Sequence, residues 1–166
     1  DASWGVILNY HRMDGRDVTI RLLQPPFNQE RPFVEALEPV VRQIASLPHP
    51  NIERMLEVDE HEGAPFLLCE FSAGQTLDER IRKLAPFSVQ ASLVLAIELV
   101  NALAALHEAK IVHGDVSGRT IRATADNHVR LMLSGLWRSY SHSRTAGSVV
   151  LPAMAPYLAP EITQGS

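Results

Sequence analysis

The apolar and β-branched residues in the first part of the chain fall into short runs separated by turn residues, a pattern typical of β-strands. Four strands are predicted there, over residues 6–10, 17–23, 52–58 and 65–71. The first two flank Asp14-Gly15, and an Asp-Gly pair between β-forming runs indicates a hairpin. A polar turn over residues 60–63 separates the other two strands. The pattern therefore predicts a hairpin followed by a second pair of strands.

Two shorter helical patterns accompany these strands. The first lies within residues 32–47. We expect this helix to begin near Pro39, because proline inside a helix costs about 3 kcal/mol but suits the first helical position. The second pattern covers residues 77–84, where Thr76 and Glu79 have the spacing of a capping box.

A third helical pattern runs from residue 88 to about residue 109 and is apolar almost all round, which predicts a helix buried inside a domain. A pair of short strands is predicted beyond it, over residues 120–124 and 128–132. The strands turn at Asp126-Asn127, and the stretch 134–165 is loop-like. Strands with one helix, followed by a mainly helical segment, predict an α+β protein of two lobes.

Composition narrows the classes of function. The 166 residues carry a formal net charge of −4 and a pI near 6.0, which argues against general binding to nucleic acid or anionic membranes. A single cysteine, Cys69, excludes an intrachain disulfide and fits a reducing compartment. No signal peptide is recognisable, and the most apolar run, 93–106, contains Glu98 and Asn101 and is too short to cross a bilayer. We therefore predict a cytoplasmic domain, or the cytoplasmic part of a larger membrane protein, that inserts into no membrane.

Six motifs follow one another in a set order along the chain. They are Val18-Thr19-Ile20-Arg21, His49-Pro50-Asn51-Ile52, the run 66–71 with Gly74 and Leu77 after it, the run from Leu106-His107 to His113-Gly114-Asp115, Leu133-Ser134-Gly135, and Tyr157-Leu158-Ala159-Pro160-Glu161. In this order and at these spacings they resemble the eukaryotic-type protein kinase superfamily, in the form common in bacteria. The resemblance implies a β-rich N-lobe over residues 1–73, with its first strand reduced or missing. It also implies a partial helical C-lobe over residues 74–166 that ends at the Ala-Pro-Glu motif.

The same resemblance assigns the phosphate-transfer machinery to positions that have lost it. Asp115 keeps the place of the residue that accepts the substrate hydroxyl proton, but the loop lysine is replaced by Ser117. The two metal-ligand positions carry Thr120 and Leu133, and an alkyl chain offers no oxygen to Mg²⁺, which takes oxygen ligands. We therefore expect no metal, no cofactor and no active catalytic residue. Asp115 is left as an acceptor for backbone N–H groups, and His113 is expected to pack in the core.

The phosphate-pairing lysine of the family is replaced by Arg21, whose planar fork is not equivalent to an ammonium group. The position of its partner glutamate is occupied by Val40, and Glu38 lies on a different face of any helix. Arg21 is therefore predicted either to face solvent or to find another partner.

The nucleotide pocket implied by the resemblance is also altered. Its remnant positions are Gly5, Thr19, Arg21, Cys69, Glu70 and Arg122. Thr19 replaces the small alanine above the base, and Arg122 replaces the apolar residue below it. Burying an unpartnered guanidinium under a base is costly, so Arg122 is predicted either to point elsewhere or to fill the pocket itself.

These substitutions favour a catalytically inactive kinase-like domain, a pseudokinase, that acts in signalling or as a scaffold. Its partner would be a protein, or a second copy of the chain, that covers the apolar helix at 88–109, because large exposed apolar surfaces mark interaction sites. No nucleic-acid partner is expected. The alternatives are a weak or atypical Ser/Thr protein kinase that uses Asp115, and a small-molecule sensor that uses the emptied cleft.

Overall fold

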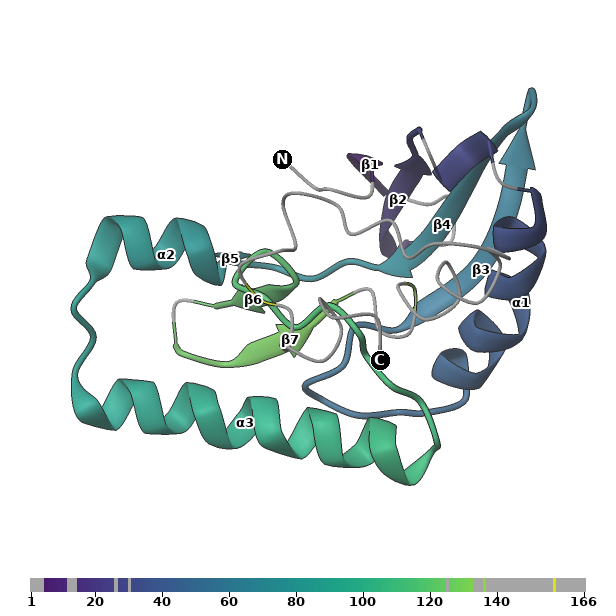
Figure 1. The fold of residues 1–166 in the computed structure, drawn as a ribbon. Helices are drawn as coiled ribbons and strands as arrows, with labels where there is room; N and C mark the ends of the chain where they lie inside the picture. The colour runs from purple at the N-terminus through teal and green to yellow at the C-terminus, as the bar shows by residue number, and fades with distance from the viewer. Residues whose placement is uncertain are drawn as a thin grey trace.

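The computed structural model describes residues 5–11, 15–25, 27–29, 31–124, 126–132, 136 and 157, and it shows two β-sheets with three α-helices (Figure 1). The larger sheet is antiparallel, with the strand order β1-β2-β4-β3. Its strands are β1 (Gly5–His11), β2 (Asp17–Leu23), β3 (Met55–His61) and β4 (Ala64–Glu70). The four strands predicted in this part of the chain are thus confirmed, with ends that shift by a few residues.

Helix α1 (Arg31–Ala45) packs against β3, and a short 3-10 helix, η1 (Phe27–Gln29), precedes it. The prediction that this helix begins near Pro39 is wrong, because Pro39 lies inside it. The helix buries one face, made by Phe33, Leu37, Val41 and Ile44, at the spacing of an amphipathic helix. Pro39 lies on the exposed side, where water can satisfy the carbonyl that proline leaves unpaired. Burial of the apolar face therefore offsets the cost of the proline.

The smaller sheet has the order β5-β6-β7 and lies between two helices (Figure 1). Its strands are β5 (Gln75–Thr76), β6 (Ile121–Ala123) and β7 (Val129–Leu131), and its helices are α2 (Leu77–Leu84) and α3 (Val89–Glu108). The predicted capping box is confirmed. Thr76 and Glu79 form the capping box of α2, and the Ser88 hydroxyl accepts a hydrogen bond from the Ala91 amide at the start of α3.

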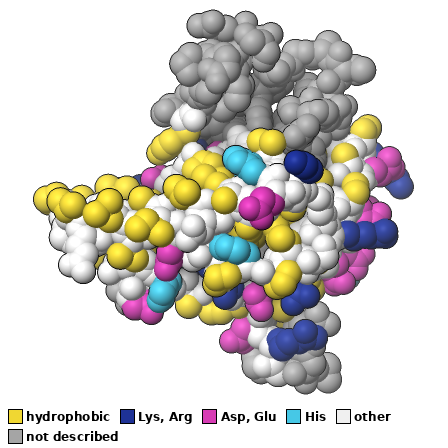
Figure 2. Space-filling model, turned by 90° about the horizontal axis from the view of Figure 1, so that it is seen from below, with side chains coloured by type: hydrophobic (Ala, Val, Ile, Leu, Met, Phe, Trp, Pro, Cys, Tyr) yellow, Lys and Arg dark blue, Asp and Glu magenta, His cyan; other side chains and the backbone are white. Residues whose placement is uncertain are grey.

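Helix α3 is not buried inside the described structure, contrary to the prediction. Only Leu95, Ala102 and Leu106 are buried, whereas Val89 is 78% exposed. Figure 2, which views the molecule from the α3 side, shows apolar side chains gathered along this face. The run 93–106, which was predicted to be too short to cross a bilayer, lies within this helix of 20 residues, whose most apolar 18-residue window has a mean hydropathy of 1.9, long and apolar enough to cross a membrane. Length and composition alone do not distinguish such a span from a helix of a soluble fold.

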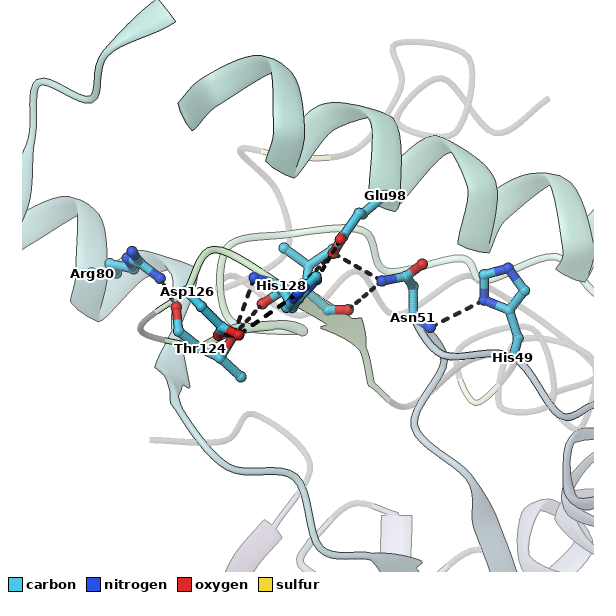
Figure 3. Close-up of polar contacts among 8 residues, drawn as sticks. His49, Asn51, Arg80, Glu98, Thr124, Asp126 and His128 are labelled. Atoms are coloured by element: carbon cyan, nitrogen blue, oxygen red, sulfur yellow. Dashed lines mark hydrogen bonds and ion pairs between the residues drawn. The ribbon is translucent and has the colours of Figure 1, made fainter. Parts of the chain in front are cut away.

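Polar contacts fasten α3 to the smaller sheet through Glu98 (Figure 3). One carboxylate oxygen accepts hydrogen bonds from the Asn51 amide group at 2.9 Å and from the Val129 backbone amide at 2.7 Å. The other oxygen lies 2.6 Å from His128 Nδ1. The acid that interrupts the apolar run therefore joins three segments that are distant in the sequence.

The two sheets are joined by backbone hydrogen bonds where residue 52 pairs with residue 131 in parallel. The Glu53 amide donates to the Leu131 carbonyl at 2.9 Å, and the Leu131 amide donates to the Asn51 carbonyl at 2.8 Å. The chain also passes from one sheet to the other between Glu70 and Gln75. The division of the lobes between residues 73 and 74 stays a prediction.

Candidate functional site

A buried ion pair lies where the two sheets meet. Arg21, on β2, donates from Nη2 to Glu53 Oε1 at 2.6 Å, and the two side chains are 4% and 1% exposed. The same nitrogen lies 3.4 Å from the sulfur of Met132. The charge of Glu53 acts against desolvation and raises the pKa of Arg21 overall. Of the two predicted fates of Arg21, the structure shows the second, a different partner.

The partner of Arg21 comes from the segment before β3 rather than from helix α1. Val40, at the position predicted to have lost the partner glutamate, is a partly buried residue that packs against the core. Glu38 lies on the exposed side of α1 and pairs with Arg42 at 2.5 Å. Sequence reasoning missed Glu53. The signal that could have found it is an acid between Ile52 and Met55, two residues that are fully apolar and buried.

Cys69 and Thr19 lie side by side in the sheet next to the ion pair. They are register partners across β2 and β4, and both are buried. Burial, and then the negative charge of Glu53, raise the pKa of the Cys69 thiol far above its usual value, so this thiol stays protonated. The Thr19 hydroxyl lies 3.1 Å from the side-chain oxygen of Asn9. Gly5, at the start of β1, pairs with Leu23 and lies at the far end of this hairpin from Asp17.

Arg122 reaches from β6 to the segment that joins the sheets. Its Nη1 donates to the Gly74 carbonyl at 2.8 Å, and its buried Nε has no hydrogen-bond partner among the described residues. Burial, followed by the positive charge of Arg21, lowers the pKa of Arg122. The contact with the Gly74 carbonyl is the hydrogen bond that the structure shows for the Arg122 side chain. Whether Arg122 points away from the nucleotide pocket or fills it stays a prediction.

The carbonyl that binds Arg122 belongs to a glycine that no other residue can replace without strain. Gly74 has φ = +101°, and a Cβ atom there would lie 2.4 Å from the Ala123 carbonyl oxygen. We expect Gly74→Ala to lower the free energy of unfolding by about 1–3 kcal/mol. Gly63→Ala is the matched control, because Gly63 has φ = +79° but no atom within 4 Å of its Cβ position. Urea denaturation of both variants tests this, and equal losses would show that the contact with Ala123 has no effect.

The segment with the remnant catalytic residue is held by a buried histidine. His113 Nε2 lies 2.8 Å from the Met132 carbonyl, and His113 Nδ1 accepts a hydrogen bond from the Asp115 amide at 3.1 Å. Burial lowers the pKa of His113 from 6.5 to about 4. The predicted core position of His113 is therefore confirmed. Asp115 itself is 5% exposed.

Ser117 and Thr120 form one tight, buried turn. The Thr120 hydroxyl donates to the Asp115 carbonyl at 2.5 Å and accepts from the Ser117 amide at 3.0 Å. The two hydroxyl groups lie 3.3 Å apart. The side chain at the predicted metal-ligand position is thus engaged by the backbone of its own loop.

The described residues do not fit a magnesium site. Leu133, the other metal-ligand position, lies outside them. Among the residues that the structure describes, no group of three or more His, Cys, Asp or Glu side chains is placed to hold a metal ion. Mg²⁺ needs near-octahedral oxygen ligation, and a threonine hydroxyl that is already bonded to backbone on both sides is a poor ligand.

The remaining predicted site residue, Glu70, turns away from the ion pair. Its carboxylate lies 3.3 Å from Arg130 Nη1, and its backbone amide donates to the Arg54 carbonyl at 2.9 Å. The structure therefore brings together Thr19, Arg21 and Cys69, adds Glu53 to them, and places the Glu70 side chain at a separate cavity.

Comparison with known proteins assigns the chain to a family. The family model of protein tyrosine and serine/threonine kinases matches residues 3–166, so the chain belongs to that family. The kinase domain of PknI of Mycobacterium tuberculosis superposes with a TM-score of 0.75 at 19% identity, over 99% of this chain and 63% of that chain. The predicted fold is thus confirmed: a two-lobe, kinase-like α+β fold with a β-rich N-lobe and a truncated helical C-lobe.

Curated relatives carry kinase names. The probable serine/threonine-protein kinase pknA2 of Bifidobacterium longum is 28% identical over 171 residues, which cover 99% of this chain and 23% of that protein. The serine/threonine-protein kinase PrkC of Bacillus subtilis is 24% identical over 150 residues, which cover 90% of this chain and 23% of that protein. The chain therefore spans about a quarter of the length of these relatives.

Proposed function

We propose that this kinase-like domain is a pseudokinase that transfers no phosphate and acts as a signalling or scaffolding module. The observation that carries the proposal is Thr120, which stands at a predicted metal-ligand position and whose hydroxyl is bonded to the backbone of its own loop. Phosphoryl transfer by a kinase needs metal ions that neutralise the charge of the triphosphate, and a lysine, ion-paired with a glutamate, that contacts its phosphates. Here an arginine, whose planar fork is not equivalent to an ammonium group, forms the ion pair with Glu53 at the position of that lysine.

Arg122, at the position below the base in the resemblance, supports the same proposal. A nucleotide base would have to displace the Gly74 carbonyl from Arg122 or stack on a guanidinium whose pKa is already lowered by burial. A nucleotide bound as in the family would therefore meet a guanidinium at the position below the base and an arginine in place of the phosphate-pairing lysine.

The exposed face of α3 is the surface that we propose for partner binding. Its exposed apolar residues are Val89, Leu93, Val94, Ile97 and Val100. A protein partner, or a second copy of the chain, would bury this face by the hydrophobic effect. The buried, protonated Cys69 fits a cytoplasmic location, which we propose for the domain or for the part of a larger protein that contains it.

Thermal unfolding with nucleotide tests this proposal. We expect no rise in Tm at about 5 mM ATP, ADP or ATP with Mg²⁺, because a ligand stabilises only the folded state that binds it. The control is the same titration with excess EDTA, which separates metal effects from nucleotide effects. A rise of several degrees that requires Mg²⁺ and disappears in Asp115→Ala would contradict the proposal. It would support the alternative, a weak Ser/Thr protein kinase that uses Asp115.

A further inference from the structure

A cavity of about 300 Å³ opens where the ends of the two sheets meet. Its lining includes Asp17 and Val18, at the start of β2, but neither Arg21 nor Glu53. The cavity is therefore separate from the Arg21–Glu53 pair. Nothing in the proposed loss of phosphate transfer uses it.

Three arginines from three separate segments line this cavity. Arg16 precedes β2, Arg54 precedes β3, and Arg130 lies on β7. Asp17 and Glu70 are the acids of the lining, so guanidinium groups outnumber carboxylates there, although the chain as a whole has a net charge of −4. A local excess of cations in a concave site favours an anionic ligand.

Arg130 is held loosely by its neighbours. It contacts Glu70 Oε2 at 3.3 Å and Ser72 Oγ at 3.5 Å, both through Nη1. An exposed pair at such distances contributes little, whereas a guanidinium fork binds a phosphate through two short parallel hydrogen bonds. Arg54 engages the Ala45 carbonyl through Nε, at 3.2 Å. In the described part of the chain, each of these two arginines therefore keeps nitrogen atoms that no hydrogen bond uses.

Apolar side chains complete the lining. Phe71 is 36% exposed at the end of β4, and Leu56 lies at a β-bulge, where the register between β3 and β4 shifts from Met55 to Glu57. A bulge leaves one residue without a cross-strand partner and re-aims its side chain. The cavity thus offers cations for an oxyanion and an apolar wall for the group that carries it.

We propose that this cavity binds a phosphorylated side chain of a partner polypeptide, of which phosphotyrosine is the best fit. The aromatic ring would contact Leu56 and Phe71, and the phosphate would replace Glu70 as the partner of Arg130. The volume of about 300 Å³ is at the lower end of ligand pockets and suits one such side chain. The proposal deepens the proposed function, because it names the chemistry of one partner of the signalling module.

Binding of N-acetyl-phosphotyrosine amide, followed by NMR shifts of the intact chain, tests the proposal. We expect it to bind at least about tenfold more tightly than inorganic phosphate, and N-acetyl-tyrosine amide not to bind at about 10 mM. Arg130→Gln is expected to weaken binding at least about fivefold. Glu70→Gln is expected to strengthen it, because it removes the competing carboxylate. Arg82→Gln, on the exposed surface of α2 and away from this cavity, is the matched control and should change nothing.

Three results would overturn this proposal. One is no binding of the phosphotyrosine probe at about 10 mM. Another is equal affinity for inorganic phosphate, which would make the cavity a site for a free anion. The third is equal affinity for the corresponding glutamate amide, which would mean that any acidic side chain suffices. A failure here leaves the ATP titration unchanged, so it is distinguishable from failure of the proposed function.

Discussion

Replacing Glu53 by leucine is expected to lower the free energy of unfolding by about 3–5 kcal/mol. The substitution removes the carboxylate 2.6 Å from Arg21 and leaves a guanidinium that is only 4% exposed. Arginine cannot escape by losing its proton, because its pKa is too high for that in a protein. The charge would therefore stay buried without a partner, or the strand would have to open to reach water. Urea denaturation of the single variant measures the loss.

The double variant Arg21→Met with Glu53→Leu is the matched control. It replaces the pair by apolar side chains of similar volume, and such replacements are often neutral or stabilising. We expect its stability to lie within about 1 kcal/mol of the original or above it. A Glu53→Leu variant that loses less than about 1 kcal/mol would contradict the buried ion pair. A double variant as unstable as the single one would show that volume, rather than charge, determines the loss.

Acid should destabilise the domain through His113, by about 3 kcal/mol between pH 7 and pH 4. Burial lowers the pKa of His113 from 6.5 to about 4 in the folded state. The unfolded chain therefore binds a proton more readily than the folded one. The stability that neutral His113 contributes to the folded state is fully present above pH 6.5 and is lost as the pH falls towards 4. The geometry gives the reason, since protonation would turn Nδ1 into a second donor facing the Asp115 amide, which already donates to it.

Denaturation curves at several pH values, together with an NMR titration of the histidine rings, measure this effect. The His128 ring is an internal contrast, because the hydrogen bond with Glu98 raises the pKa of His128. The stability that charged His128 contributes is therefore lost as the pH rises. His113→Gln keeps a donor for the Met132 carbonyl but has no ring to titrate, and it should flatten the fall in stability between pH 7 and pH 4. If the His113→Gln variant loses as much stability between pH 7 and pH 4 as the original chain, titratable groups other than His113 cause the loss.

Local signals in the sequence predicted most of the elements. The capping box of Thr76 and Glu79 and the cap at Ser88 mark helix starts by hydrogen bonds between near neighbours, so they can be recognised without the fold. Pro39 misled the prediction of α1, because the burial of Phe33 and Leu37 that offsets its cost depends on a strand elsewhere in the chain. For α3, the all-round apolar pattern predicted burial inside the domain, whereas the partial C-lobe predicted an apolar surface left for a partner to cover. The structure shows an exposed apolar face, because composition describes a helix but not its neighbours.

The candidate site was only partly predictable. The motifs located Arg21 and showed that Val40 could not pair with it, but the partner was sought in the helix where the family keeps it. Glu53 lies 32 positions from Arg21, and only the sheet register brings the two together. The sequence left open whether Arg122 points away from the pocket or fills it. Its contact with Gly74 depends on the path of the segment that joins the two sheets past β6, which the sequence does not show.

The origin of Glu53 in the segment before β3 has a consequence for how the domain could be regulated. A helix that supplies one half of an ion pair can break the pair by moving, but α1 supplies neither half here. A shift of α1 would leave the charge balance between the sheets unchanged. A movement of this helix can therefore reach the pair only indirectly, through β3, against which α1 packs, and through Arg54, which bonds the Ala45 carbonyl at the end of α1.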